Sequence, residues 1–414
     1  NPGPLGQFAD YGEGYFIFPR LEGPIGPRMK FQGKEVIFWS ANDYLGLCNH
    51  PEVLEADAKA AAEYGMFYPM GARAMSGETE QHLQLERELA DFVGKESAYL
   101  LNFGYQGMVS TIDALVSRHD VIVYDSNSHA CIVDGVRLHM GKSFMFRHND
   151  MDSFEKNIKR ATKVAEENGG GILVITEGVF GMTGQQGKLK EIAEFKKQYS
   201  FRLLVDDAHG FGTLGKTGAG AGEEQGCQDQ IDVYFSTFAK SMAGFGAFIA
   251  GNKEIIRYLK FNLRSQIFAK SLTMPMVIGG LKRLELLRTR PEIKAKLWEN
   301  VEKLQKGLLD RGFNLGNSNT CVTPVFMQGT PVEATLLVKD LRENFGIFTS
   351  VVVYPVIPKG SILLRLIPTA SHTDAEINET LAAFEAIHDK LVNGVYKQQA
   401  EKLLEEQNLS FKPL

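Results

Sequence analysis

Six short runs of apolar residues, with a weaker seventh, follow one another between residues 98 and 250. Helical patterns separate several of them, notably over Met108–Val116, Met151–Glu167 and Leu189–Tyr199. Continuous apolar strands that alternate with helices are typical of a mostly parallel sheet covered on both faces. The runs are Ala98–Leu101, Val121–Tyr124, Ser143–Phe146, Ile172–Thr176, Leu203–Val205, Val233–Phe235 and Phe248–Ala250. The sequence therefore predicts an α/β fold around such a sheet.

The pattern changes beyond Ala250, where long amphipathic helices and shorter strands follow. This succession favours a smaller α+β domain. Helices are expected over Met276–Arg290, Glu292–Asp310 and Asp374–Leu391, and strands near Val322–Met327, Ile347–Val353 and Ile362–Ile367. We predict four parts: an N-terminal arm and strand (residues 1–45), a large domain (46–285), a small C-terminal domain (286–395) and a polar helical tail (396–414).

Composition excludes several classes of protein. The net charge of −5 argues against a nucleic-acid binder, because neutralising phosphates requires clustered Lys and Arg. No apolar run reaches the roughly 18–20 residues that span a bilayer, and no basic stretch with an apolar core marks a signal peptide. The four cysteines lie far apart, which favours reduced thiols in a cytoplasmic protein over disulfides or a zinc site. They are Cys48, Cys131, Cys227 and Cys321.

Polar and glycine residues follow several predicted strands, the place where ligands bind in open α/β sheets. Asn102–Gly107 is a glycine-punctuated turn into a helix, which offers backbone N–H groups to an anion such as phosphate. Such a turn is also common without any ligand. Asp125–His129 brings one carboxylate and a histidine to the end of a buried strand, and Asp206–Gly210 brings two carboxylates and a histidine. A carboxylate buried there without a partner would cost roughly several kcal/mol, so a partner is expected.

Lys240 lies in the apolar, small-residue segment FAKSMAGFGAF. Such a setting disfavours the charged form of the amine, as a nucleophilic lysine requires. Simpler alternatives stay open for each feature: a solvent-exposed lysine, structural histidines, and a loop carboxylate that caps the next element. His129 and His209 bring no ligand cluster at zinc spacing, so a metal site is not expected.

Together these segments resemble a fold-type I pyridoxal phosphate enzyme, and more narrowly the α-oxoamine synthases. That family condenses an amino acid with an acyl thioester and releases CO₂. The resemblance extends from about Asn42 to His372, and it implies a mostly parallel seven-stranded sheet, a smaller α+β domain and pyridoxal 5'-phosphate as cofactor. The motifs that carry it are Asn42–Gly46, Gly71–Gly77, Asp206–His209, Thr237–Ser241 and Leu364–Thr373.

The resemblance implies roles for individual residues. Lys240 resembles the lysine that carries the cofactor and moves the Cα proton, and Asp206 resembles the partner of the pyridinium nitrogen. His209 resembles the contact of the phenolic oxygen, and His129 the imidazole stacked on the ring. Arg365 resembles the arginine that holds the substrate carboxylate. The remaining implied residues are Gly104, Tyr105 and Thr237 for the phosphate, Ser271 and Thr273 as phosphate contacts from a second subunit, and Asn42, Tyr44 and Arg73 for the substrate.

The branch that the chain resembles most is bacterial serine palmitoyltransferase, which implies condensation of L-serine with a palmitoyl thioester in the first step of sphingolipid synthesis. Departures from the usual residues leave the amino acid open, with cysteate, glycine or alanine as alternatives to serine. These departures are Ala72, Met108, Gly210 and Ser236. Coenzyme A and acyl carrier protein both stay open as the acyl carrier.

Two other classes are weighed against this one. An aminotransferase would share Lys240 and Asp206 but would need no acyl thioester. A catalytically silent subunit has no need for Lys240, Asp206 and His129, so their presence argues against it.

The resemblance also implies a homodimer with shared active sites. The apolar residues 16–18 of the arm either contact the inner face of a membrane peripherally or pack on the dimer partner. Met66, Phe67, Tyr68 and Met70 either line a channel for the acyl chain or belong to the core.

Overall fold

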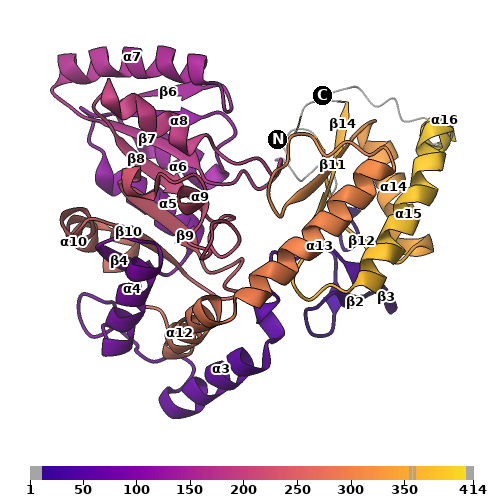
Figure 1. Ribbon diagram of the computed structural model, residues 1–414, viewed down its shortest axis with the longest axis horizontal. Coiled ribbons are helices and arrows are strands. Elements are labelled where there is room, and N and C mark those ends of the chain that lie inside the picture. Colours follow the sequence, from indigo (N-terminus) through magenta and orange to yellow (C-terminus); the bar gives the residue numbers. More distant parts are fainter. Residues whose placement is uncertain (1–11, 354–356, 358–359, 407–414) are drawn as a thin grey trace. The chain divides into compact units, whose positions relative to one another are not determined.

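The predicted apolar runs form one sheet in the computed structural model, which describes residues 12–353, 357 and 360–406 (Figure 1). Its strands are β4 (Ser97–Leu101), β5 (Val121–Asp125), β6 (Lys142–Phe146), β7 (Ile172–Glu177), β8 (Arg202–Asp206), β9 (Val233–Thr237) and β10 (Ala247–Gly251). They lie in the order β4-β10-β9-β8-β7-β5-β6. β10 is antiparallel to both neighbours, and the other adjacent pairs are parallel. The predicted mostly parallel seven-stranded sheet is confirmed.

Three helices cover one face of this sheet: α5 (Gly104–Leu115), α6 (Ala130–Leu138) and α10 (Lys253–Asn262). Their apolar side chains, Ile112 and Ile132 among them, are fully buried together with those of the strands. Each such side chain contributes about 1.5–3 kcal/mol to the free energy of unfolding. This packing fixes the first turns of α5 and α6 at the carboxyl ends of the strands.

The sheet belongs to the larger of two compact units, which comprises residues 42–181 and 185–295. Thr79 caps α4 (Glu80–Phe92) by accepting from the backbone N–H of His82, and Asp150 caps α7 (Met151–Asn168) by accepting from the backbone N–H of Ser153. Such caps contribute about 1 kcal/mol each. The unit's other helices are α3 (Pro51–Tyr64), α4 (Glu80–Phe92), α7 (Met151–Asn168), α8 (Leu189–Glu194), α9 (Ala221–Glu224), α11 (Arg264–Ile267) and α12 (Met274–Thr289), with 3-10 turns η1 (Leu47–Asn49), η2 (Phe195–Lys197) and η3 (Gln228–Gln230).

The smaller unit comprises the described residues of 1–41, 182–184 and 296–414. One of its sheets has β1 (Leu21–Glu22), β2 (Arg28–Phe31), β3 (Lys34–Phe38) and β12 (Ile347–Phe348) in that order, and the other has β11 (Thr323–Gln328), β14 (Ser361–Leu366) and β13 (Ser350–Val352). Its helices are α14 (Pro331–Asn344), α15 (Asp374–Val392) and α16 (Val395–Glu406), and α13 (Pro291–Asp310) begins in the larger unit and ends here. The expected α+β composition is confirmed.

The N-terminal arm packs on Arg342 of α14. The Arg342 guanidinium lies 4.0 Å from the centre of the Phe348 ring and 5.2 Å from that of Tyr15, whose carbonyl it also contacts. Burial lowers the pKa of Arg342 to about 10. Phe16, one of the residues considered for a membrane contact, packs against the core of the smaller unit. Tyr15 and Phe16 of the arm thus belong to the packing of the smaller unit.

Part of the predicted arm, residues 1–11, and part of the predicted tail, residues 407–414, lie outside the described residues. Within the described part of the chain, no helix combines the length and the apolar character that crossing a bilayer requires.

Candidate active site

Three neighbouring strands bring their last residues to one edge of the sheet. These residues are Glu177 of β7, Asp206 of β8 and Thr237 of β9, and Glu177 pairs with Asp206 across the β7–β8 ladder. Lys240 follows β9, and its positive charge favours the ionised forms of both carboxyls. The structure therefore assembles Asp206, Thr237 and Lys240 where a ligand of an open α/β sheet binds.

Asp206 is a buried carboxyl that accepts few hydrogen bonds from the described residues. Its Oδ1 accepts from the backbone N–H of Ala208 at 3.1 Å, and its Oδ2 lies a long 3.9 Å from the Cys131 thiol. Burial raises the pKa of Asp206, while the charges of Lys240 and His129 act in the opposite direction. A protonated ring nitrogen at Oδ2 would supply the strong donor that the carboxylate lacks, so this site fits a pyridinium.

The amino end of α5 lies close to the carboxyl end of β9. A Cβ at Gly104 would lie 3.1 Å from Thr237 Oγ1, so only glycine allows this close approach without a shift. The N-cap residue of α5, Phe103, makes no capping hydrogen bond with its apolar side chain. The first turn of the helix therefore lies close to the Thr237 hydroxyl, and its N–H groups have no cap from the Phe103 side chain, an arrangement that fits a phosphate.

His209 lies four residues beyond the end of the β8 apolar run and is buried. Its Nδ1 is hydrogen-bonded to the Tyr44 hydroxyl at 2.6 Å, and the two rings meet at 68°. Tyr44 was predicted to bind substrate and His209 to contact the cofactor. The structure brings both together, so the tyrosine orients the imidazole.

His129 is the N-cap residue of α6, and its ring stands edge-on to Tyr105 with 6.2 Å between the ring centres. Partial burial lowers the pKa of His129, the Lys240 charge adds to this effect, and Asp206 opposes it. The imidazole is therefore neutral near pH 7. Its backbone N–H donates to Glu177, which ties α6 to β7.

Two buried carboxyls of this site were not among the predicted residues. Asp207 accepts from Tyr234 and from the backbone N–H of Ala221, both at 2.9 Å, and burial raises its pKa to about 7. Burial and the charge of Asp206 raise the pKa of Glu177 well above its usual range. Glu177 directly follows the predicted run 172–176, so inspection of the next residue would have identified it.

Arg73 has partners other than a substrate in this structure. Its guanidinium binds Glu86 and Glu78, each at 2.8 Å, and lies 5.0 Å from the centre of the Tyr99 ring. Burial alone would lower the pKa of Arg73, but the hydrogen bonds and charge of Glu86 raise it. Its predicted contact with substrate stays a prediction.

The remaining predicted residues lie in other surroundings. The Ser271 hydroxyl donates to the carbonyl of Gly71 at 3.1 Å, and Thr273 is the N-cap residue of α12. Asn42 is the first residue of the larger unit, whereas Arg365 lies on β14 of the smaller unit. The roles inferred for these four residues stay predictions.

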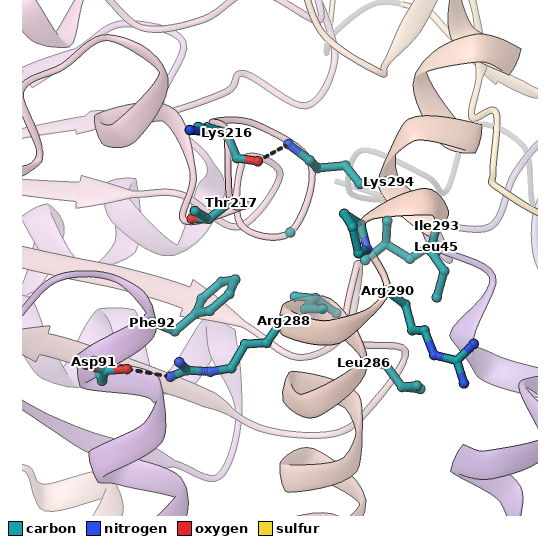
Figure 2. Close-up of a pocket in the computed structure, with 13 residues that line it drawn as sticks. Leu45, Asp91, Phe92, Lys216, Thr217, Leu286, Arg288, Arg290, Ile293 and Lys294 are labelled. Carbon is teal, nitrogen blue, oxygen red and sulfur yellow. Dashed lines mark hydrogen bonds and ion pairs between the residues drawn. The ribbon is translucent and has the colours of Figure 1, made fainter.

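A cavity of about 460 Å³ lies elsewhere in the larger unit, beside the carboxyl end of α12 (Figure 2). Apolar and cationic side chains line it. Arg288 donates to Asp91 at 2.8 Å, and Lys294 donates to the carbonyl of Lys216 at 3.1 Å. The described residues that line it include none of the predicted site residues, so it is distinct from the candidate active site.

Comparison with known proteins agrees with this geometry. The family model for aminotransferase class I and II matches residues 34–384. The chain belongs to this family. It is 66% identical to the cysteate-C-fatty acyltransferase of Capnocytophaga ochracea over 98% of this chain and 97% of that protein. It is 33% identical to the serine palmitoyltransferase of Sphingobacterium spiritivorum over 94% of each. A solved structure of SPT (serine palmitoyltransferase) with a PLP (pyridoxal phosphate) internal aldimine superposes on this chain with a TM-score of 0.84 at 29% identity. The match covers 90% of this chain and 93% of that one.

Within that family the chain is a fold-type I α-oxoamine synthase close to serine palmitoyltransferase, as its motifs predict. Its cofactor is pyridoxal phosphate. It is an acyltransferase that acts on an amino acid and an acyl thioester. The aminotransferase and silent-subunit alternatives are therefore set aside.

His82 holds the segment that carries Ser271 and Thr273. It is fully buried, its Nε2–H donates to the Leu272 carbonyl at 3.0 Å, and burial lowers its pKa to about 4. The unfolded chain, with a His pKa of about 6.5, binds more protons, so stability falls as pH drops from 6.5 towards 4.

We expect His82→Gln to flatten part of this dependence. Between pH 7 and 4.5, wild type should lose about 2 kcal/mol more free energy of unfolding than the variant. Urea unfolding at both pH values measures the difference. Parallel losses in the two proteins would show that His82 is not the group responsible.

Proposed function

We propose that this protein condenses cysteate with a long-chain acyl thioester to give a 2-amino-3-oxo sulfonate. The bond from Cα to the carboxylate breaks and releases CO₂, the bond from Cα to the acyl carbon forms, and the thiol leaves with one proton. The observation that carries the proposal is the 66% identity, over nearly the full length of both chains, to a cysteate-C-fatty acyltransferase. Identity to a serine palmitoyltransferase is half as high, at 33%. Cysteate, the predicted alternative, is therefore favoured over serine.

In this proposal three side chains and the amino end of α5 hold the ring and the phosphate of the cofactor in the larger unit. Asp206 accepts from the ring nitrogen, the α5 amino end with Thr237 binds the phosphate, and Lys240 anchors the ring. When bound, pyridoxal phosphate supplies an electron sink for charge that develops at Cα. The buried setting of Asp206, which is 5% exposed, strengthens its electrostatic hold on a cationic nitrogen.

Further roles concern the amino acid and the phenolic oxygen of the cofactor. Lys240 takes the proton from Cα and returns one after CO₂ has left. His129, neutral at the amino end of α6, donates through Nε2 to the substrate carboxylate. Arg365 is proposed to hold the same carboxylate by a bidentate contact. The paired His209 and Tyr44 fix the cofactor's phenolic oxygen.

The surroundings of Gly210 support a site that differs from the serine enzymes, in which serine is expected at this position. A Cβ at residue 210 would lie 2.0 Å from Asp207 Oδ1, so the serine side chain does not fit here without a shift. Asp207 in turn is held by Tyr234 and Ala221. The local packing therefore favours glycine and departs from the serine palmitoyltransferase pattern.

The test is a direct competition between amino acids. The purified enzyme, loaded with pyridoxal phosphate, is given palmitoyl-CoA with cysteate, serine, glycine or alanine, and thiol release and CO₂ are followed. We expect kcat/KM for cysteate to exceed that for serine by at least about 10²-fold, because a buried site built for a charged sulfonate leaves its partners unpaired with serine. The product should carry the sulfonate by mass spectrometry. Preference for serine or glycine would overturn the proposal.

Gly210→Ser supplies a separate prediction. Forcing a hydroxymethyl group against Asp207 should cost about 1–3 kcal/mol of unfolding free energy, the usual penalty of overpacking. It should also lower kcat, since His209 directly precedes residue 210 and Ala208 of the same turn donates to Asp206. Gly171→Ser is the matched control, because its Cβ would meet its nearest neighbour at an ordinary 3.5 Å. Equal stability of the two variants by urea unfolding would contradict the packing argument.

We also propose that two copies of the chain form a dimer with shared sites. Segment 66–75 exposes apolar side chains that a monomer would leave in water, including Phe67 at 68%, Met70 at 76% and Met75 at 87% exposure. Light scattering after size exclusion tests this proposal, and Met70→Lys with Met75→Lys should shift the species towards monomer. A monomeric wild type would refute it.

The four free cysteines support the predicted cytoplasmic location.

A further inference from the structure

Cys131 lies between two residues of the candidate site. It is the second residue of α6 and is 3% exposed. Its Sγ lies 3.0 Å from Nδ1 of His129 and 3.9 Å from Oδ2 of Asp206. The backbone N–H of Cys131 also donates to the same Nδ1 at 3.3 Å. One thiol thus contacts both the imidazole and the buried carboxyl.

These contacts determine where the proton of the imidazole resides. An Nδ1 that accepts from a backbone N–H carries no proton itself, so the neutral ring bears its proton on Nε2. The thiol at 3.0 Å is a second donor to Nδ1. Because both donors come from residue 131, this residue selects the tautomer that presents an N–H to the substrate.

The thiol is unsuited to chemistry of its own. Burial raises the pKa of Cys131, and the carboxyls of Asp206 and Glu177 raise it further, while Lys240 opposes them. A reactive thiolate needs exposure and a lowered pKa, and Cys131 has neither. His129, Asp206, Glu177 and Lys240 are the titratable groups that face it.

We propose that Cys131 is a positioning residue that holds His129 in its Nε2–H tautomer and leaves Asp206 Oδ2 available to a stronger donor. A thiol is a weak donor, and at 3.9 Å it competes little for the carboxylate. The side chain therefore serves both neighbours: it fixes the imidazole and shields the carboxyl from water without satisfying it. This inference rests on the proposed roles of His129 and Asp206.

The test is ¹⁵N NMR of the histidine-labelled enzyme, with and without pyridoxal phosphate, between pH 6 and 8. Comparison with His129→Asn assigns the signal among the nine histidines. We expect wild type to show a protonated Nε2 and a bare Nδ1. In Cys131→Ala only the backbone donor is left, so the other tautomer should rise to about one part in ten or more, the effect of one lost hydrogen bond. Cys131→Ser, whose hydroxyl can donate, should restore the wild-type signal.

Kinetics supply a second readout. Cys131→Ala should lower kcat in proportion to the share of the Nε2–H tautomer that is lost, at least about one part in ten, with little change in the KM for the amino acid, and should move the acid limb of the pH profile upwards. Cys227→Ala is the matched control, because Cys227 is similarly buried at 4% exposure in the same unit.

Unchanged ¹⁵N shifts and an unchanged pH profile in Cys131→Ala would overturn the inference. If that variant fails to fold, loss of the Nε2–H tautomer in Cys131→Ser would overturn it instead. The tautomer is measured without substrates. The NMR result therefore does not depend on whether the enzyme prefers cysteate in the competition assay.

Discussion

Replacing Lys240 with alanine should lower kcat by at least about 10³-fold, the largest effect expected for any single residue of this chain. The amine is proposed both to anchor pyridoxal phosphate and to move the proton at Cα, and alanine can do neither. Lys240 lies beside the ends of β8 and β9, and its charge acts on Asp206 and Glu177. No other amine is placed at this edge by the described contacts.

A chemical readout separates this role from a general loss of structure. Borohydride reduction of the wild-type holoenzyme should leave the cofactor on the peptide that contains Lys240, and the alanine variant should release it on denaturation. Lys216→Ala is the control, because Lys216 is an exposed lysine of the same unit and should retain full activity. Attachment of the cofactor to another lysine in wild type would disprove the assignment.

The fold was predictable because its signals are local. Six strands of the large sheet are runs of mostly buried apolar residues, and such runs stand out in one sequence, whereas the edge strand β6 is largely exposed and gave the weaker signal. The start of α7, which Asp150 caps, was placed at the residue where the structure has it. By contrast α6 begins at Ala130 after a histidine cap and α5 begins at Gly104 after a phenylalanine, and neither is a common helix start. The helix α6 was therefore missed, and α5 was expected four residues late.

The site was predictable only in part, because its residues come from different strands. Asp206, Thr237 and Lys240 each follow an apolar run, and the parallel sheet brings them together. The environment of Lys240 was not readable from its own segment, since the carboxyls that surround it belong to β7 and β8. Cys131 was read only as a reduced thiol, because its contacts with His129 and Asp206 depend on the position of α6.

Arg73 shows the limit of assigning a role from a motif. The motif implies a substrate contact, whereas the structure surrounds the guanidinium with Glu86 and Glu78. Glu86 also accepts from the backbone N–H of Leu100 at 2.9 Å, so the ion pair joins α4 to β4. The two roles predict different results, and one variant distinguishes them.

Arg73→Met should lower the free energy of unfolding by about 3–5 kcal/mol, because it leaves the buried carboxylate of Glu86 without a counter-ion. Urea unfolding measures the loss. The double variant Arg73→Met with Glu86→Gln should recover most of it, since removing both charges avoids the uncompensated group and the amide oxygen can still accept from Leu100. Arg87→Met is the control, because Arg87 lies next to Glu86 on α4. Its side chain is 62% exposed and pairs with exposed Glu80, so little change in the free energy of unfolding is expected. If Arg73→Met instead raises the KM for cysteate and leaves unfolding unchanged, the arginine binds substrate and the structural role is refuted.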